Sequence, residues 1–421
     1  MKVLSLFDGM ACGMLAMLSA GVSVDRYVAF EIDKYATQTS SHNFPMIEHR
    51  GDVFQADFTE FSGFDFLVGG SPCTYWSIAQ KNNRETEASG MGWELFSQYV
   101  RALKEAKPKW FIYENNKSMS NAIRESITGT FGFEPICINS ALVSAQNRQR
   151  LYWVGRRNPD GTYSRVRVDQ PEDRCILLRD VLDGMTDREK GRCVISSGGR
   201  TTTREYFKKN QGKPVRIPEY GNEEKARPLG ANYSNNCGGF EHRMFSDKPN
   251  KQQVDMVAEP MRVGTWPNNA KNQAHDSQQY RIYSTNGKSV AICGNGGGMG
   301  AKTGLYAIPV EYDGEIPTKA VSYADGKTYP VYQVKDGQIT IKGKQYPIKL
   351  ADGFYIIRKL TVSECKKLQT VPEWYEFPVS DTQAYKMLGN GWTVEVIAHL
   401  VNATQADELE EEQLDLFKMW G

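Results

Sequence analysis

The stretch Gly69-Gly70-Ser71-Pro72-Cys73 directly follows a short apolar run, Phe64-Asp65-Phe66-Leu67-Val68. The run has the length and composition of a buried strand, and the glycine pair marks its end. Reactive groups of α/β proteins lie on loops just past strand ends, so Cys73 is a candidate nucleophile. The alternative is that Cys73 is a small buried hydrophobe, as most isolated cysteines are.

The other seven cysteines stand singly, and no Cys-x-x-Cys pair points to zinc or redox chemistry. Unpaired cysteines are typical of a reducing compartment. The apolar start of the chain is interrupted by Asp8 and by glycines, which does not fit a signal peptide. We therefore expect a cytoplasmic protein that holds no metal ion and does not contact a membrane.

The charge of the chain is unevenly distributed. The 421 residues are enough for two or three domains, and the formal net charge is only +1. Residues 186–355, however, hold 25 Lys and Arg against 17 Asp and Glu. Such a segment either faces a polyanion or is a solvated surface, and charge alone leaves both interpretations open.

The first 155 residues alternate strand and helix patterns. The predicted strands are 2–6, 26–30, 64–68, 110–113 and 151–155, and the predicted helices are 14–19, 34–44 and 94–105. This alternation is typical of an α/β fold with a doubly wound, mainly parallel sheet.

The pattern changes at about residue 186. Gly, Asn, Thr and Pro become dense and helical periodicity is lost, which predicts a small β-rich insertion with a hairpin over 331–348. Helical patterns return at 361–368 and 392–402. We therefore divide the chain into a catalytic and cofactor-binding domain over 1–185, an insertion over 186–355, and a segment over 356–421 that packs back on the first domain.

The turn after the first strand, Phe7-Asp8-Gly9-Met10-Ala11-Cys12-Gly13, would let a cofactor approach the backbone, although its glycines do not match the dinucleotide fingerprint. Glu31 ends the next strand, where an acidic side chain usually binds ribose hydroxyls. Asp52 would accept from an adenine amino group. The set predicts an adenosine cofactor without a pyrophosphate. The alternative is that Asp8 and Asp52 are turn and cap residues.

Glu114 and Asn115 end the strand predicted at 110–113. A carboxyl group there, held protonated by burial, would donate to a ring nitrogen of a substrate. Arg148 and Arg150 occupy alternate positions of an extended segment and so face the same way. They suit a phosphate or the orientation of Glu114, or they are surface charges.

In this order, these segments resemble the DNA cytosine-5 methyltransferases. The matching segments are the loop at 7–13, Glu31, Asp52, Pro72-Cys73, Glu114-Asn115, the Gln-x-Arg-x-Arg at 146–150, and two late segments, 358–369 and 388–394. The resemblance implies a Rossmann-like methyltransferase domain that uses S-adenosylmethionine. It also implies that residues 186–355 form the target recognition domain.

The resemblance further implies a reaction. The chain would transfer a methyl group from S-adenosylmethionine to C5 of a cytosine flipped out of a specific double-stranded DNA site. Cys73 would form a bond to C6, Glu114 would donate to N3, and Arg148 and Arg150 would supply positive charge. The enzyme would act as a monomer in a bacterial or phage-infected cell, in restriction–modification or phage genome protection.

The candidate residues form three groups. The catalytic candidates are Cys73, Glu114, Arg148 and Arg150. The cofactor candidates are Phe7, Asp8, Gly9, Met10, Gly13, Glu31, Ile32, Asp52, Val53, Pro72, Asn390 and Trp392. The candidate DNA contacts, chosen from their loops, are Ser71, Gln146, Asn232, Asn235, Arg262, Arg281 and Asn295.

Three positions depart from the family pattern. Asn116 stands where the family usually has Val, Thr74 stands where it has Gln, and Gly391-Trp392 replaces the commoner Ser-Val. Three other functions stay open. These are a tRNA cytosine-5 methyltransferase, a catalytically silent DNA-binding relative, and an adenosine-binding oxidoreductase.

Overall fold

The structure is a computed structural model. It describes residues 1–77, 84–183, 192–193, 215–216, 258–267, 277–294, 300, 302–310, 317–321 and 327–420, with the backbone alone over 192–193, 215–216, 321 and 409–420. Three of the candidate DNA contacts, Asn232, Asn235 and Asn295, lie outside the described residues.

The first half of the chain builds one sheet with the strand order β3-β2-β1-β4-β5-β8-β6, to which β9 is added beside β8. Its strands are β1 (Lys2–Leu6), β2 (Arg26–Phe30), β3 (Glu48–His49), β4 (Phe66–Gly69), β5 (Trp110–Asn116), β6 (Ile136–Asn139), β8 (Gln149–Arg157) and β9 (Tyr163–Arg165). β1 pairs in parallel with β2 and β4, and β4 with β5, whereas β8 is antiparallel to β5. The predicted mainly parallel sheet is confirmed. The strand order reverses at β1, which is where ligands bind in open α/β sheets.

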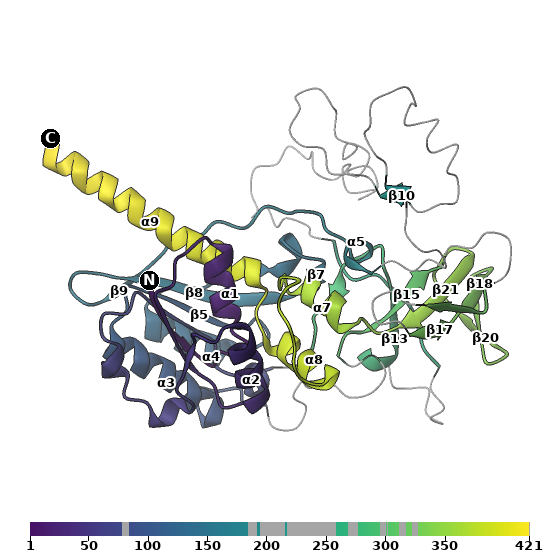
Figure 1. The fold of residues 1–421 in the computed structure, drawn as a ribbon, viewed down its shortest axis with the longest axis horizontal. Coiled ribbons are helices and arrows are strands. Elements are labelled where there is room, and N and C mark those ends of the chain that lie inside the picture. Colours follow the sequence, from purple (N-terminus) through teal and green to yellow (C-terminus); the bar gives the residue numbers. More distant parts are fainter. Residues whose placement is uncertain are drawn as a thin grey trace.

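Helices cover both faces of this sheet (Figure 1). Alternate residues of β1 face opposite sides, so that Val3 contributes to one core cluster and Leu4 to the other. α1 (Cys12–Ser19) and α9 (Val394–Trp420) pack on the first face, and α3 (Gly90–Ala106) and α4 (Asn121–Phe131) pack on the second. The doubly wound arrangement expected from the sequence is therefore present.

Two helices are clearly longer than predicted. α3 begins at Gly90, before the predicted start at 94. α9 continues to Trp420 instead of ending at 402, because the residues beyond 402 are mostly strong helix formers such as Ala, Glu, Gln and Leu. In Figure 1 its C-terminal end extends beyond the sheet. The remaining helices are α2 (Lys34–Asn43), α5 (Leu178–Val181), α7 (Val362–Leu368) and α8 (Asp381–Asn390).

The second half contains a β-rich module, drawn in green in Figure 1. Its sheet has the order β12-β13-β15-β21-β18-β19-β20. The strands are β12 (Arg262–Thr265), β13 (Arg281–Ser284), β15 (Leu305–Pro309), β18 (Tyr332–Lys335), β19 (Gln338–Ile341), β20 (Lys344–Pro347) and β21 (Gly353–Arg358). Three short two-stranded pairs complete the described strands: β10 (Arg192–Cys193) with β11 (Val215–Arg216), β14 (Ser289–Val290) with β7 (Gln146–Asn147), and β16 (Lys319–Val321) with β17 (Thr328–Pro330).

The hairpin predicted over 331–348 is confirmed as β18 and β19, with β20 as a third strand. Asp336 and Gly337 form its turn with φ values of 51° and 71°. Positive φ at both central residues is what a two-residue hairpin turn requires, because it matches the twist of the strands.

A buried lysine and a strand pair join the module to the first sheet. Lys288 is 0% exposed, and its ammonium group donates to the carbonyl oxygens of Ala141, Ser144 and Ile176. The next residues form β14, which pairs in parallel with β7. The boundary expected between 355 and 356 falls inside β21, which runs on to Arg358.

A buried ion pair connects β21 to α7. The Arg358 guanidinium donates twice to the Glu364 carboxylate, at 2.7 Å to each oxygen, and the two side chains are 1% and 0% exposed. Glu364 also accepts from the backbone N–H of Thr361 at 2.8 Å, which closes the capping box of α7. The pair thus fixes where the chain leaves the module and returns to the first domain.

We predict that Glu364→Gln destabilises the protein by about 3–5 kcal/mol, because it leaves the charge of Arg358 buried without a counter-charge. The matched control is Glu48→Gln, which breaks the exposed pair with Arg26 and should cost at most about 1 kcal/mol. Urea unfolding of both variants measures the difference. Equal losses in the two variants would contradict the importance of the buried pair.

Candidate active site

The loop after β1 has a strained backbone. Phe7, Gly9 and Ala11 have φ values of 58°, 60° and 60°, in the left-handed region. Only glycine adopts this conformation at little cost, and strain of this kind at other residues is concentrated at functional sites. A Cβ at Gly9 would meet nothing within 4 Å, so this part of the loop faces open space.

Glu31 holds this loop at the end of β2. Its Oε2 accepts from the backbone N–H of Gly9 at 2.8 Å, and its Oε1 accepts from those of Ile32 and Asp33 at 2.9 and 2.7 Å. The sequence predicted a contact to ribose hydroxyls and did not anticipate these backbone bonds. The bond from Gly9 connects turns that follow different strands, and no local pattern marks it.

Asp8 is buried at the start of this loop, and one of its two carboxylate oxygens is bound by neighbouring hydroxyl groups. Its Oδ1 accepts from the hydroxyls of Ser5 and Tyr27 at 2.6 and 2.7 Å. Its Oδ2 is buried and has no hydrogen-bond partner among the described residues. Burial raises the pKa of Asp8 to about 6, although the two hydroxyl donors act in the opposite direction.

The other cofactor candidates differ in their contacts and in how far they are exposed. Asp52 caps the 3₁₀ helix at Val53–Gln55 by accepting from the backbone N–H of Phe54 at 3.0 Å, as the cap interpretation expects. Ile32 and Phe54 are 79% and 42% exposed, which is unusual for large apolar side chains. Met10, Gly13 and Val53 are buried, whereas Pro72 and Asn390 are exposed.

The Cys73 loop lies directly against Glu114. A Cβ on Gly70 would lie 2.6 Å from the carbonyl oxygen of Glu114 and 2.9 Å from its Oε2, so only glycine fits here. Ser71 Oγ hydrogen-bonds with Tyr113 OH at 2.7 Å, and the Asn115 amide donates to the Ser71 carbonyl at 3.1 Å. Cys73, half-buried, begins a 3₁₀ helix over Cys73–Tyr75. The end of β5 therefore positions the candidate nucleophile.

Trp76, Arg84 and Glu85 anchor the chain beyond Cys73. The Trp76 ring is 0% exposed, and its indole N–H donates to Glu85 Oε2 at 3.1 Å. Arg84 donates to the carbonyl oxygens of Trp76 and Ser118 at 3.1 and 2.6 Å. The sequence identified this segment only as a departure from the family pattern and did not predict this anchoring role.

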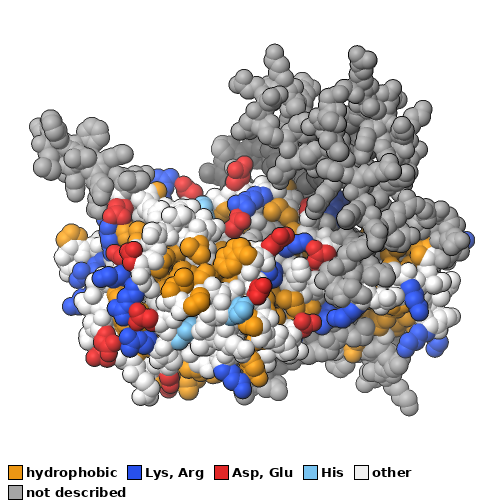
Figure 2. All heavy atoms as spheres, in the orientation of Figure 1, with side chains coloured by type: hydrophobic (Ala, Val, Ile, Leu, Met, Phe, Trp, Pro, Cys, Tyr) orange, Lys and Arg blue, Asp and Glu red, His pale blue; other side chains and the backbone are white. Residues whose placement is uncertain are grey.

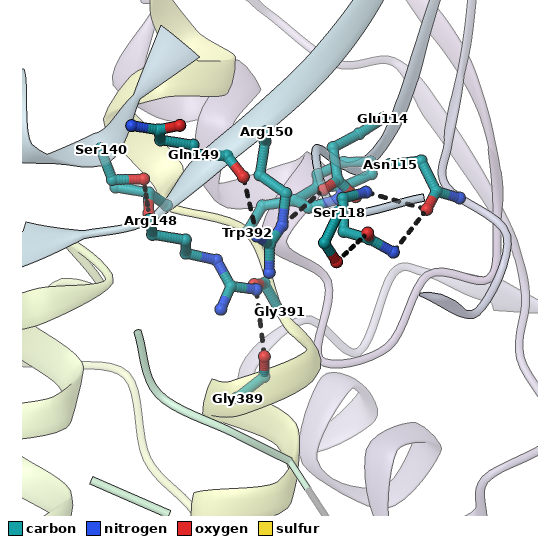
Figure 3. A network of polar contacts seen from close by, with 12 residues as sticks. Glu114, Asn115, Ser118, Ser140, Arg148, Gln149, Arg150, Gly389, Gly391 and Trp392 are labelled. Carbon is teal, nitrogen blue, oxygen red and sulfur yellow. Dashed lines mark hydrogen bonds and ion pairs between the residues drawn. The ribbon is translucent and has the colours of Figure 1, made fainter. Parts of the chain in front are cut away.

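The Glu114 carboxylate receives a donor on each oxygen (Figure 3). Arg150 Nε lies 3.0 Å from Oε1, and the Trp392 indole N–H donates to Oε2 at 2.9 Å. The Glu114 and Arg150 side chains are only 12% and 16% exposed. Of the two arginines that the sequence offered for orienting Glu114, Arg150 is the one in contact with its carboxylate. The contact from Trp392 was not predicted.

Arg148 has a different role from Arg150. It is 4% exposed and donates to the carbonyl oxygens of Ile292, Gly389 and Gly391 at 3.2, 3.0 and 2.9 Å. Burial and the charge of Arg150 lower the pKa of Arg148 to about 10, while Glu114 and Cys73 act in the opposite direction. Arg148 is therefore not a surface charge, and Cys73 and Glu114 both lie within its electrostatic reach.

Two candidate DNA contacts are buried. Ser71 is 3% exposed and bonds to the end of β5, as described above. Gln146 is 0% exposed, accepts from the backbone N–H of Ile292 at 3.0 Å and donates to the Leu368 carbonyl at 3.2 Å. These bonds favour a structural role for both. Arg262 is exposed on β12, and Arg281 is half-buried at the start of β13.

The surface has mixed charge on the face drawn in Figure 2. Blue and red side chains are interspersed there around a group of apolar ones. None of the helices among the described residues is long and apolar enough to cross a membrane. Within the same ranges, no three His, Cys, Asp or Glu side chains are grouped as a metal site requires.

We predict that the contribution of Asp8 to the free energy of unfolding falls by about 2–3 kcal/mol as the pH rises from about 4 to about 6. The folded-state pKa of Asp8 is raised to about 6, so the folded protein binds this proton more tightly than the unfolded chain. Asp8→Asn keeps the acceptor for Ser5 and Tyr27 and should remove the fall. Urea unfolding between about pH 4 and about pH 7.5 measures it.

The control for this prediction is Asp57→Asn, which removes an exposed cap carboxylate whose pKa is lowered by donors from Thr59. It should leave the fall between about pH 4 and about pH 6 in place. An Asp8→Asn protein that keeps the pH dependence of the wild type would show that Asp8 is not its source.

Comparison with known proteins identifies the family. The family model for C-5 cytosine-specific DNA methylases matches residues 1–406. Orphan methyltransferase M.Rho11sI of Bacillus phage rho11s is 27% identical over 329 residues, which are 73% of this chain and 60% of that protein. Orphan methyltransferase M.SPRI of Bacillus phage SPR is 34% identical over 169 residues, or 37% of this chain and 38% of that protein. The chain thus spans less than two thirds of the length of these phage relatives.

A third relative matches over most of its length. Type II methyltransferase M.HhaI of Haemophilus parahaemolyticus is 23% identical over 410 residues, which are 95% of this chain and 93% of that protein. Among solved structures, the Entamoeba histolytica methyltransferase EhMeth shares the fold, with a TM-score of 0.50 at 13% identity over 96% of this chain and 98% of that one. Because the family model covers residues 1–406, this chain belongs to the C-5 cytosine-specific DNA methylase family.

Proposed function

We propose that the protein transfers a methyl group from S-adenosylmethionine to C5 of a cytosine in double-stranded DNA. The observation that carries this proposal is the close approach of the Cys73 loop to Glu114, whose carboxylate is held by Arg150. Addition to a pyrimidine ring needs a nucleophile and a proton donor, and these two residues lie at the ends of two neighbouring parallel strands. Membership of the C-5 cytosine-specific family supports the substrate and the position of transfer.

The residues around the loop after β1 fit S-adenosylmethionine. Glu31 and Asp52 carry acceptors for its ribose hydroxyls and adenine amino group, and the exposed side chains of Ile32 and Phe54 offer apolar surface to the adenine ring. Asp8 Oδ2, which is buried without a partner among the described residues, suits its ammonium group. When bound, S-adenosylmethionine supplies an electrophilic methyl group on a positively charged sulfur.

Cys73 would make C5 reactive. C5 of cytosine is a poor nucleophile, but addition of a thiolate to C6 pushes the electrons of the C5–C6 double bond toward C5. Arg148 places positive charge near Cys73, and a neighbouring positive charge in general favours a thiolate over a thiol. Once C5 carries the methyl group, a base removes the C5 proton. The returning electron pair restores the double bond and breaks the bond between C6 and sulfur, and the N3 proton returns to Glu114 as the thiolate leaves.

Glu114 would neutralise the ring during the addition. Negative charge develops on the ring as the sulfur adds, and a proton given to N3 by Glu114 removes it. Arg150 holds one carboxyl oxygen, so the group meets the ring in a fixed orientation. A donor that is already oriented lowers the barrier without reorganisation during the reaction.

The β-rich module would select the DNA site. Cytosine C5 inside a duplex is out of reach, so the base must be flipped into the site at a cost of a few kcal/mol. We propose the division into a catalytic domain, a target recognition domain and a returning C-terminal segment. We also propose a DNA contact by Arg262, which is exposed on β12. We also propose that the enzyme acts as a monomer in the cytoplasm.

We predict that Cys73→Ala abolishes the covalent complex with DNA. Duplex DNA containing 5-fluoro-2′-deoxycytidine traps the enzyme, because fluorine at C5 blocks the final elimination. With S-adenosylmethionine present, the wild-type protein should form a complex that survives denaturing electrophoresis, and Cys73→Ala should form none.

The matched control is Cys293→Ala. Cys293 is a half-buried cysteine that also lies within reach of the charges of Arg148 and Arg150. This variant should still be trapped. A complex formed by Cys73→Ala, or one lost only in Cys293→Ala, would rule out Cys73 as the nucleophile.

We predict that Glu114→Gln slows methyl transfer by at least about 100-fold, because glutamine cannot give a proton to the ring. The measurement is the single-turnover rate of transfer of a radiolabelled methyl group to duplex DNA. Glu125→Gln, at an exposed position of α4, is the control and should transfer at the normal rate. A near-normal rate in Glu114→Gln would remove the assignment of Glu114 as proton donor.

A further inference from the structure

Trp392 makes a polar contact that a family-typical residue at its position does not make. Its indole N–H donates to Glu114 Oε2 at 2.9 Å across 278 positions of sequence. Figure 3 shows the ring beside Glu114 and Arg150. Among the DNA cytosine-5 methyltransferases that this segment resembles, valine is commoner here, and valine has no donor. The role of this contact therefore has to be inferred from the surroundings of Trp392 in this chain.

The backbone that carries Trp392 is held on both sides. Before the ring, the carbonyl oxygens of Gly389 and Gly391 accept from Arg148. After it, Thr393 Oγ1 donates to the side chain of Gln369 at 2.8 Å, and the Gln369 amide donates to the Leu388 carbonyl at 2.6 Å. These bonds restrict the backbone of the turn, which fixes the position from which the indole N–H donates to Glu114.

The same turn packs against the cofactor loop. A Cβ on Gly391 would lie 3.1 Å from Cys12 Sγ and 3.7 Å from Met10 Sδ. The Met10 carbonyl in turn accepts from the Tyr375 hydroxyl at 2.6 Å. Trp392 thus stands between the loop that would hold S-adenosylmethionine and the carboxyl group that would protonate the base.

The donor restricts the orientation of the Glu114 carboxyl group. Arg150 takes one lone pair of Oε1, and the indole takes one lone pair of Oε2. Both partners are donors only, so neither can accept the proton that Glu114 has to carry. With two contacts the plane of the carboxyl group is defined, whereas Arg150 alone would leave it free to turn about the bond to Arg150.

We propose that Trp392 is a positioning residue for proton transfer by Glu114, acting through its indole N–H. The proposal rests on the proposed role of Glu114 as proton donor. Trp392 fixes which lone pair of Oε2 stays open for the proton, and it does so from the turn that also contacts the cofactor loop. A hydrogen bond to a charged group is strong enough for its loss to slow transfer about tenfold.

The test is a double-mutant cycle on the single-turnover rate of methyl transfer. Trp392→Phe keeps an aromatic ring and removes the N–H, and we expect a loss of about tenfold, with the KM for S-adenosylmethionine changed less than about twofold. In a Glu114→Gln background the same substitution should cost less than about twofold, because the proton transfer that it supports is already gone. Trp374→Phe, at a residue that is 55% exposed, is the control and should leave the rate unchanged.

The outcomes separate this proposal from the one on which it rests. Equal tenfold losses from Trp392→Phe in both backgrounds would show that Trp392 acts without Glu114, and would overturn the inference. The absence of a loss in the wild-type background would overturn it as well. A normal rate in Glu114→Gln alone would instead remove the role of Glu114 as proton donor.

A second measurement does not depend on activity. In the ¹⁵N-labelled protein, the indole N–H resonance that disappears in Trp392→Phe belongs to Trp392. This resonance should move upfield in Glu114→Gln, because an amide oxygen is a weaker acceptor than a carboxylate. An unchanged resonance in a folded Glu114→Gln protein would show that the bond does not exist in solution and would overturn the proposal.

Discussion

The close approach of Gly70 to Glu114 is the constraint on which the whole site depends. β4 and β5 run side by side in parallel, with Gly69 paired to Tyr113, so the loop that carries Cys73 and the residue after Tyr113 leave the sheet at the same edge. A side chain at position 70 would collide with the Glu114 backbone and carboxylate. The pair of a nucleophile and a proton donor is therefore a direct consequence of sheet register and of one missing Cβ.

Contacts from the C-terminal segment and from the β-rich module hold this edge of the sheet in place. Arg148 and Arg150 come from the same short segment, at the start of β8. Arg148 donates to the turn at 389–391 and Arg150 contacts Glu114, so this segment is connected both to the C-terminal part of the chain and to Glu114. The module is joined to the same region through β14 and β7 and through the buried ammonium of Lys288.

Local sequence patterns predicted those features that local physics decides. The alternation of apolar segments predicted the sheet, and Asp336-Gly337 predicted a hairpin, because positive φ is a local requirement. Local patterns could not predict three contacts: Glu31 with Gly9, Trp76 with Glu85, and Trp392 with Glu114. Each of them depends on how separate elements are placed relative to one another in the fold. Ser71 and Gln146 show the same limit: both were predicted at a DNA surface from their loops, and both have their hydrogen bonds inside the protein.

The most direct test is nucleoside mass spectrometry of unmethylated duplex DNA incubated with the protein and S-adenosylmethionine. We expect 5-methylcytosine in the DNA, and none when the protein carries Cys73→Ala. Sequencing of the same product would then give the target site. A protein that binds duplex DNA but leaves its cytosines unmodified, while methylating tRNA or nothing at all, would contradict the proposed reaction.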